Sequence, residues 1–320
     1  MLFEKAVINK YKKRILARRD ADGTQHYFAP SDFAGLSWDD IDFTGDRGQR
    51  LYGHIYYRGA KRSDTVLVFD HGMGCGHVAY MKEIDLLTKR GFTVATYDHT
   101  GTRRSEGADI GCMAQSLADL ECFIGALKQT ELGAAEIAVI GHSWGGFSAM
   151  NIPALCPEVK KVVAISGFVN THQVLKDALT GLLKLYTKAI LNVEDEVIPR
   201  FNGISSIESL KSSGAKALII HSRDDTTVRF ETSYMALKEA LEGGGRVEFL
   251  AEDDKLHHPT YTHEAVKYRS QFSAERKRLK RQGRLSTPEE KAAFVASYDF
   301  DKMTEQDTRV WDKIVEFLNK

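Results

Sequence analysis

The sequence predicts an α/β fold with a mostly parallel central sheet, helices on both faces of that sheet and an inserted helical cap. From Thr65 onward, short runs of β-branched and aliphatic residues alternate with segments long enough to form helices. Each run is continuously apolar, as expected for strands that are covered on both faces. Strand–helix alternation is typical of βαβ units, whose right-handed crossovers place helices on both sides of a parallel sheet.

The predicted strands and helices follow one another along the chain. Two segments with alternating polarity, 41–43 and 51–57, come first. Continuous apolar runs follow at 65–70, 92–98, 136–141, 159–166, 215–222 and 247–252. Helices are expected between these runs over 79–90, 112–130, 144–155 and 230–242, and a last helix is expected over 308–320.

Two long segments interrupt this alternation. Residues 171–213 place apolar side chains at three- and four-residue spacing and predict an inserted helical cap; the alternative is a thick crossover that only packs on the sheet. Residues 262–308 form a second insertion, in which the basic run 274–284 is expected to be a solvated helix face and Thr287-Pro-Glu-Glu290 to start a helix. The predicted organisation is a helical N-terminal extension (1–35) and one α/β core (36–170 and 214–320) that carries both insertions.

Composition limits the classes of function. Of 320 residues, 42% are hydrophobic and 28% are charged, which suits a folded protein with a sizeable core. Basic and acidic residues number 44 each, so the net charge of zero gives no reason to expect a nucleic-acid partner. Four dispersed cysteines, no signal-peptide core and no integral membrane segment predict a soluble protein of the reducing cytoplasm, with no indication of an oligomeric state.

The sharpest motif is Gly141-His-Ser143-Trp-Gly145, which lies between an apolar strand and a predicted helix. A strand–turn–helix elbow needs small residues on both sides of the central serine, because the backbone there is strained and closely packed. The turn lifts the hydroxyl to the top of the sheet at a helix N-terminus. Ser143 is therefore the candidate nucleophile, the alternative being a structural serine in a glycine-rich turn.

The elbow predicts further groups downstream, since a serine hydroxyl is a poor nucleophile without an oriented base. The arrangement calls for an acid and then a histidine, in loops after later strands. Asp224 and Asp225 follow the run 215–222, and His257 and His258 follow the next run. These positions lie at the carboxyl ends of strands, where α/β sheets bind their ligands. The spacing leaves both members of each pair as candidates.

A glycine-rich loop, His71-Gly-Met73-Gly74, follows the first continuous apolar strand. Such a loop lets a backbone N–H point to where an oxyanion develops. Met73 is the expected first donor, and Trp144, directly after the candidate nucleophile, is the expected second. Cys75 is expected to line the pocket as a small packed hydrophobic residue.

Together these motifs resemble the successive landmarks of the α/β-hydrolase superfamily, in particular its serine aminopeptidase and monoacylglycerol-lipase-like (lysophospholipase-like) branch. The resemblance rests on the loops 71–74 and 98–107 and on the segments GHSWGG, HSRDDTTV and KLHHP. It covers roughly residues 40–260 and the last helix. The resemblance implies an α/β-hydrolase fold, a Ser–Asp–His triad and no cofactor.

Carried over by position, the resemblance assigns the nucleophile and the acid. Ser143 matches the family's nucleophile. The family's acid usually precedes a valine by three positions, which favours Asp225, before Val228, over Asp224.

The histidine is assigned in the same way. In the family it usually follows a residue like Lys255 by two positions, which favours His257 over His258. Two positions depart from the family pattern: Arg103 stands where the second glycine of a Gly-x-Gly-x-Ser loop is usual, and Leu256 stands where a glycine commonly precedes the histidine.

The resulting expectation is a serine hydrolase that transfers an acyl group to water. The aliphatic cap predicts an apolar acyl group, bound by Leu179, Leu182, Leu183 and Tyr186. A carboxylesterase or a monoacylglycerol/lysophospholipid-type lipase, acting on a small ester or lipid-like substrate, fits this pattern. No metal-ligand motif and no nucleotide-binding glycine motif is present, so no metal or cofactor is expected.

Two alternatives stay open. A peptidase of the aminopeptidase type would need an anionic subsite, which Glu194, Asp195 and Glu196 in the predicted cap could supply. A catalytically silent α/β-hydrolase that acts as a binding module is the other, although the complete set of candidate catalytic residues argues against it. Arg103 and Arg104 could contact a phosphate or carboxylate head group, while solvent-facing arginines are the simpler expectation.

Overall fold

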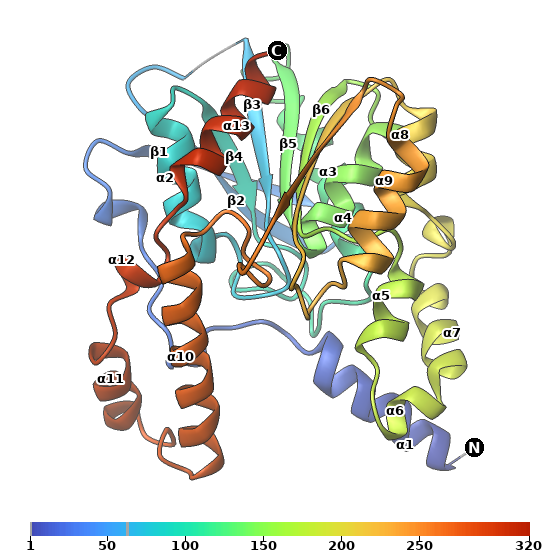
Figure 1. The fold of residues 1–320 in the computed structure, drawn as a ribbon, viewed down its shortest axis with the longest axis vertical. Helices are drawn as coiled ribbons and strands as arrows, with labels where there is room; N and C mark the ends of the chain where they lie inside the picture. The colour runs from blue at the N-terminus through green and yellow to red at the C-terminus, as the bar shows by residue number, and fades with distance from the viewer. Residues whose placement is uncertain (1, 62–63) are drawn as a thin grey trace.

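The computed structural model describes residues 2–61 and 64–320 and contains an eight-stranded sheet (Figure 1). Its strands are β1 (Ser37–Thr44), β2 (Arg50–Tyr57), β3 (Thr65–Asp70), β4 (Thr93–Tyr97), β5 (Glu136–His142), β6 (Val159–Ile165), β7 (Lys216–Ser222) and β8 (Val247–Glu252). Their order in the sheet is β1-β2-β4-β3-β5-β6-β7-β8. Strand β2 runs antiparallel to both of its neighbours, and the strands from β4 to β8 are parallel. The predicted mostly parallel sheet is confirmed.

Helices cover both faces of the sheet (Figure 1). Helices α2 (Met81–Lys89) and α13 (Thr308–Asn319) pack apolar side chains on one face. Helices α3 (Gln115–Leu127), α4 (Trp144–Asn151), α8 (Ser206–Ser212) and α9 (Ala236–Leu241) contribute to the apolar cluster on the other face. Because both faces are covered, the central strands are almost wholly buried, which explains their continuous apolar runs.

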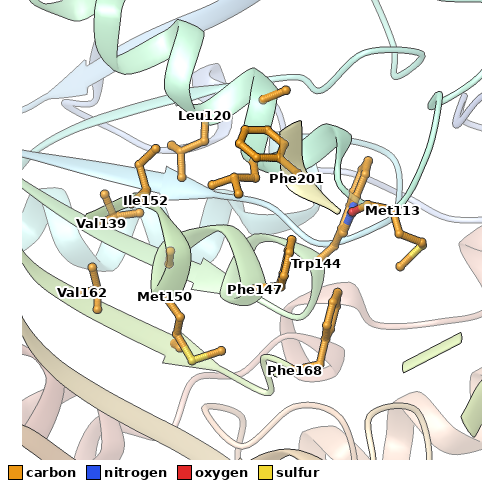
Figure 2. Packing of buried hydrophobic residues seen from close by; sticks show 14 of the residues in the cluster. Met113, Leu120, Val139, Trp144, Phe147, Met150, Ile152, Val162, Phe168 and Phe201 are labelled. Atoms are coloured by element: carbon orange, nitrogen blue, oxygen red, sulfur yellow. The ribbon is translucent and has the colours of Figure 1, made fainter. Parts of the chain in front are cut away.

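The core is densest around α4, the helix that follows the serine motif. Figure 2 shows its side chains Phe147 and Met150 among the apolar residues of β5 and β6. Phe147 stacks on Phe168 with ring centroids 4.8 Å apart. The buried indole of Trp144 donates a hydrogen bond of 2.6 Å from Nε1 to the Met113 carbonyl oxygen. The start of α4 is therefore fixed by packing and by a hydrogen bond.

The segment predicted as a cap forms short helices at the carboxyl edge of the sheet. These are α5 (Thr171–Ala178), α6 (Leu182–Leu185) and α7 (Thr187–Val197), followed by a 3-10 turn at Pro199–Phe201. The N-terminal helix α1 (Leu2–Tyr11) contacts α6 and α7 (Figure 1). Tyr11 Oη donates a 2.6 Å hydrogen bond to the buried carboxylate of Glu194 in α7. This hydrogen bond ties the end of α1 to α7.

The insertion at 262–308 forms helices α10 (His263–Arg281), α11 (Pro288–Ala296) and α12 (Phe300–Met303), with a small apolar cluster of their own. The capping box predicted at Thr287 and Glu290 is present. In Figure 1 these helices lie on the other side of the carboxyl edge from α5–α7, and the chain between α1 and β1 runs across the space between the two groups. Among the described residues, no helix combines the length and the apolar character needed to cross a membrane.

Candidate active site

Ser143 occupies a strained turn between β5 and α4. Its backbone has φ 56° and ψ −109°, a conformation that costs a residue with a side chain about 1–3 kcal/mol. Gly141 and Gly145 make this turn possible, because a Cβ on Gly141 would lie 2.0 Å from the Gly145 oxygen and one on Gly145 would lie 2.1 Å from the Asp70 oxygen. The Ser143 N–H donates to the Ile165 oxygen at 2.8 Å. These contacts fix the serine at the carboxyl edge of the sheet.

The structure joins Asp225 to His257. Asp225 Oδ2 lies 2.6 Å from His257 Nδ1, and Oδ1 accepts hydrogen bonds from the backbone N–H groups of Thr227 and Val228 at 2.8 and 3.0 Å. Burial opposes ionisation of this carboxyl, but hydrogen bonds and charge interactions from His221 and His257 outweigh it and hold the pKa of Asp225 below its ordinary value. Because a carboxylate only accepts, His257 carries its proton on Nδ1 and leaves Nε2 free to act as a base.

The neighbouring Asp224 has a different position. Its Oδ1 accepts hydrogen bonds from the Ser222 hydroxyl at 2.5 Å and from the backbone N–H groups of Lys255 and Leu256 at 3.2 and 3.1 Å. It therefore holds the loop that carries His257.

His258, the other candidate histidine, packs between aromatic rings. It stacks on Tyr261 and His142 with centroid distances of 4.9 and 5.4 Å. Burial, and then the positive charge of Arg269, keep its pKa well below the ordinary value. The structure thus brings Asp225 to His257, while His258 contributes a neutral ring to the wall of the site.

Ser143 and His257 line one cavity, with a volume of about 660 Å³. Within the described chain no hydrogen bond joins the Ser143 hydroxyl to the His257 ring; such bonds often tighten only when substrate is bound. Met73 and Trp144 line the same cavity. Neither of their backbone N–H groups has an acceptor among the described residues. Cys75 lines the cavity as well, and burial raises the pKa of its thiol.

A chain of hydrogen bonds connects the three loops around this cavity. The Gly72 N–H donates to Tyr80 Oη at 3.0 Å, and Tyr80 Oη lies 2.8 Å from His142 Nδ1. His142 Nε2 lies 2.8 Å from the His257 carbonyl oxygen. Because that carbonyl only accepts, Nε2 carries the His142 proton and the Tyr80 hydroxyl donates to Nδ1. Burial lowers the pKa of His142 to about 3, so this arrangement holds at neutral pH.

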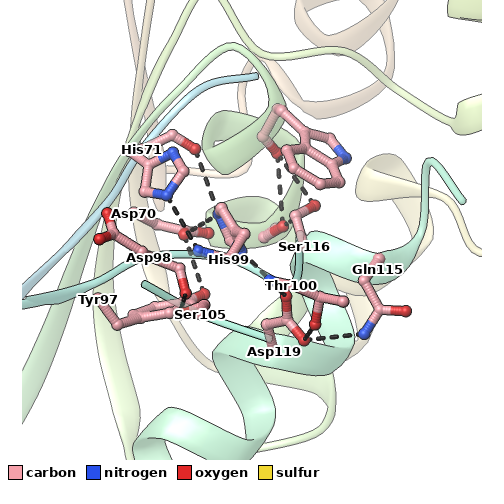
Figure 3. Close-up of polar contacts among 12 residues, drawn as sticks. Asp70, His71, Tyr97, Asp98, His99, Thr100, Ser105, Gln115, Ser116 and Asp119 are labelled. Atoms are coloured by element: carbon pink, nitrogen blue, oxygen red, sulfur yellow. Dashed lines mark hydrogen bonds and ion pairs between the residues drawn. The ribbon is translucent and has the colours of Figure 1, made fainter. Parts of the chain in front are cut away.

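A buried polar cluster supports the glycine-rich loop from below (Figure 3). His99 lies between two carboxylates, with Nε2 2.9 Å from Asp70 and Nδ1 3.4 Å from Asp119. Burial opposes protonation of His99, but the two carboxylates outweigh it and raise its pKa to about 10. The His99 backbone N–H donates to His71 Nε2 at 3.2 Å, and His71 Nδ1 then donates to the Gly72 oxygen at 2.8 Å. The loop before Met73 is therefore anchored to a charged core.

The wall of the cavity has two characters. Helix α5 and the turn after it contribute Val174, Leu175, Ala178 and Leu179. The N-terminal segment and α10 contribute charged residues, which are Arg18, Arg19, Asp20, Asp22, Arg269 and Arg276. No group of three or more His, Cys, Asp or Glu side chains in the described chain is arranged to hold a metal ion.

Of the residues predicted to bind substrate, Leu179 lines the cavity. The lining residues in the described chain do not include Leu182, Leu183 or Tyr186. Leu183 is buried in the core, and Leu182 is 39% exposed. The three- and four-residue spacing would place all four side chains on one face of a continuous helix. Because α5 ends at Ala178, the residues after it do not continue that face.

The charged residues considered from the sequence lie outside the cavity wall. Glu194 is tied to Tyr11 and to the Met113 N–H, and Asp195 pairs with His172 at 2.7 Å. Arg104 stacks on the Tyr52 ring at 4.7 Å, and Arg103 Nε lies 3.6 Å from Asp98. Glu196 is exposed.

Sequence reasoning missed three arginines of the cavity wall, Arg19, Arg269 and Arg276, and the role of Tyr80. Arg269 and Arg276 are seven residues apart and share one face of α10. That spacing was available in the sequence, but Arg276 belongs to the basic run 274–284, which was expected to be only a solvated helix face. Arg19 is 250 residues from Arg269, and nothing in the sequence joins the two.

Solved structures share this fold. An esterase of Pyrococcus furiosus superposes with a TM-score of 0.61 and 21% identity, over 83% of this chain and 99% of that chain. A bacterial brefeldin A esterase gives a TM-score of 0.56 and 14% identity, over 92% of this chain and 86% of that chain. A Butyrivibrio proteoclasticus protein with bound ferulic acid gives 0.55 and 15% over 73% of this chain and 98% of that chain. At these identities the likeness establishes the fold.

Sequence comparison identifies the family. A curated protein of Arabidopsis thaliana, provisionally named methylesterase 15, chloroplastic, is 33% identical over 121 residues, which span 37% of this chain and only 26% of that protein. A family model described as serine aminopeptidase, S33, matches residues 61–262, which include β3 to β8 and every candidate catalytic residue. The match covers more than half of the chain, and the chain therefore belongs to the serine aminopeptidase S33 family of α/β-hydrolases.

Proposed function

We propose that the protein is a serine hydrolase that cleaves carboxylic esters through Ser143, His257 and Asp225. The observation that carries the proposal is the 2.6 Å contact between Asp225 and His257, beside a serine in a strained elbow on the same cavity wall. An acid, a histidine and a serine with these partners are the parts that acyl transfer to water requires.

The mechanism follows from these contacts. His257 Nε2 takes the Ser143 proton as the serine oxygen attacks the ester carbonyl. Asp225 keeps the imidazole in the required tautomer and stabilises the imidazolium that forms. The free N–H groups of Met73 and Trp144 are the proposed donors to the oxyanion, each worth roughly 3–4 kcal/mol in the transition state. His257 then protonates the leaving alcohol, and water releases the acid from the acyl-enzyme by the same steps.

The substrate class is proposed from the cavity wall. The aliphatic side formed by α5 and Leu179 suits an apolar group, as in a carboxylesterase or a monoacylglycerol/lysophospholipid-type lipase. Names of similar proteins support ester chemistry, since the Arabidopsis relative is named as a methylesterase and the Pyrococcus protein as an esterase. In this proposal residues 171–213 act as the cap over the site.

The family description favours a second candidate, an aminopeptidase. Such an enzyme would have to bind the cationic N-terminus of a peptide near Ser143. The two aspartates of the cavity wall are already paired, Asp20 with Arg18 at 2.9 Å and Asp22 with Lys280. We therefore favour the esterase, and substrate comparison separates the two.

The test uses a fluorophosphonate probe and matched substrates. We expect the probe to label the unaltered protein. Ser143→Ala should abolish labelling and should lower the rate of p-nitrophenyl ester hydrolysis by at least about 10³-fold. Ser273→Ala, at an exposed serine of α10, is the control and should behave as the unaltered protein. Labelling that does not depend on Ser143 would reject the triad. Faster cleavage of aminoacyl-naphthylamides than of p-nitrophenyl esters would establish the peptidase instead.

A further inference from the structure

The positive charge on the cavity wall exceeds its negative charge. Four arginines and two aspartates line the cavity. Arg18 pairs with Asp20 at 2.9 Å, and Lys280 on α10 pairs with Asp22. Among the described residues, no carboxylate lies within 4.0 Å of the guanidinium of Arg19, Arg269 or Arg276. Three cations that line the same cavity as the candidate nucleophile are therefore left without an ion pair.

The contacts that these arginines do make are to neutral groups. Arg276 lies over the Phe272 ring at 5.4 Å and reaches the Gln25 side chain at 3.4 Å. Arg19 donates from Nη2 to the Ile15 carbonyl oxygen and to Met73 Sδ, and its buried Nε has no hydrogen-bond partner. A half-buried guanidinium without a carboxylate is costly, unless a ligand supplies the missing charge.

Arg269 has one acidic neighbour, which does not neutralise it. The carboxyl of Glu83 interacts with it electrostatically, but no ion pair joins these two described residues. Burial raises the pKa of Glu83 to about 7, so this group is largely protonated below that pH. The rings of His142 and His258, which also face Arg269, stay neutral because burial lowers their pKa.

The three arginines are placed to act on one ligand. Arg269 and Arg276 are two turns apart on the same face of α10, and Arg19 lines the same cavity from the N-terminal segment. The 3.4 Å contact from Arg19 to Met73 Sδ puts this cation beside the loop proposed to hold the oxyanion. The aliphatic residues of α5 line another part of the same wall. An extended substrate could place an apolar part against α5 and a charged part against the arginines.

We propose that the substrate is an anionic ester, whose carboxylate or phosphate group binds Arg19, Arg269 and Arg276 while its apolar chain lies against α5. This inference rests on the proposed ester hydrolysis at Ser143. Guanidinium groups bind carboxylate and phosphate through charge-assisted, often bidentate hydrogen bonds, so the arginines select the substrate rather than take part in the chemical step. Arg269 and Arg276 are thus specificity residues supplied by the second insertion.

The test compares three esters that share one acyl group. Hexanoate release is measured from 1-hexanoylglycerol, from its 3-phosphate and from the corresponding glycerate ester, which carries a carboxylate. We expect kcat/KM for the phosphate or the glycerate ester to be at least about ten times that for the neutral ester. A tenfold difference is the effect of one charge-assisted hydrogen bond. The double variant Arg269→Gln/Arg276→Gln should lower this anionic-to-neutral ratio by about tenfold, and the preferred anion identifies the natural group.

Controls separate this inference from the proposed function. Arg281→Gln makes the same change at an exposed position of α10 and should keep the ratio. The Ser143→Ala protein allows binding without turnover, so calorimetry with the phosphate and neutral esters tests anion recognition even if no ester is cleaved. A ratio of one in the unaltered protein, a ratio that the double variant retains, or equal binding of both esters by Ser143→Ala would each overturn the inference. Hydrolysis independent of Ser143 would instead reject the proposed function.

Discussion

At the scale of single residues, the adjacent carboxylates Asp224 and Asp225 are expected to have different roles. Asp225 contacts the His257 ring at 2.6 Å, whereas Asp224 contacts only a hydroxyl and the backbone of the loop that carries this histidine. Substituting Asp225→Asn should lower kcat by about 10³–10⁴-fold, because an amide favours the wrong imidazole tautomer. Asp224→Asn should lower it by less than about tenfold, since its amide oxygen still accepts the two backbone hydrogen bonds.

Rates of hydrolysis and of fluorophosphonate labelling, measured on both variants with thermal unfolding as a check on folding, test this assignment. Equal losses in the two variants, or a larger loss for Asp224→Asn, would contradict it. Sequence alone placed both carboxylates in the loop after β7, which the structure brings to His257, and only the resemblance to a family favoured Asp225. The choice depends on which side chain turns toward His257, and that is set by the backbone of two separate loops.

Single residues also explain the two departures from the family pattern. Arg103 and Leu256, which stand where the family usually has glycine, both have φ 49°. This left-handed conformation favours glycine and costs other residues roughly 1–2 kcal/mol. The chain thus has, at both positions, a backbone conformation that suits the glycine usual in the family but carries a residue that adopts it less freely. Arg103 is held by a hydrogen bond from Arg18 to its carbonyl oxygen, and Leu256 by its N–H bond to Asp224.

At the scale of elements, one hydrogen-bond chain links the loop after β3, the end of β5 and the loop after β8. Tyr80 is its centre, accepting from the Gly72 N–H and donating to His142. Tyr80→Phe would leave the Gly72 N–H and His142 Nδ1 without partners and would loosen both Met73 and His257. We expect kcat to fall about tenfold with little change in KM, because the effect falls on groups proposed to act in the transition state.

A matched substitution gives the control for this positioning role. Tyr57→Phe removes another tyrosine hydroxyl, whose contact with Asp39 is 3.5 Å long; neither residue is among the described residues that line the cavity. It should leave kcat as it is. If Tyr80→Phe raised KM and left kcat unchanged, or lowered activity only through loss of folded protein, the hydrogen-bond chain would have a structural role alone.

Elements were predictable to different degrees. The strands of the core followed from their continuous apolar runs, because burial on both faces leaves no other composition. The helices of the segment 171–213 were predictable from the period of their apolar residues, but the direction in which each helix runs was not. The helix ends at Ala178 and a new one begins at Leu182, so that Leu183 points into the core and Leu182 is exposed. The basic run 274–284 was expected to be a solvated helix face; most of its basic side chains are exposed, but Arg276 lines the cavity together with Arg269.

At the scale of the whole molecule, the cavity is assembled from parts far apart in the sequence. The wall with the candidate catalytic residues comes from the core, the aliphatic wall from α5, and the cationic wall from the N-terminal segment and α10. Motifs within one loop carry their own geometry and could be recognised in the sequence. The cationic wall depends on tertiary packing across 250 residues, which leaves no local pattern.

The whole fold also rests on the charged core beneath the site, and this gives a prediction for stability. His99, between Asp70 and Asp119, has its pKa raised from 6.5 to about 10, so folding favours its protonated form. The resulting stabilisation is complete below about pH 6.5 and is lost as the pH rises through about 10.

His99→Gln should lower the free energy of unfolding by about 3–5 kcal/mol at pH 7, since it leaves buried carboxylates without their cation. Thermal unfolding from pH 6 to pH 10 should show a steeper fall in Tm for the unaltered protein than for His99→Gln, and His263→Gln, at an exposed histidine, should follow the unaltered protein. Parallel pH profiles for the protein and His99→Gln would show that His99 is neutral in the core.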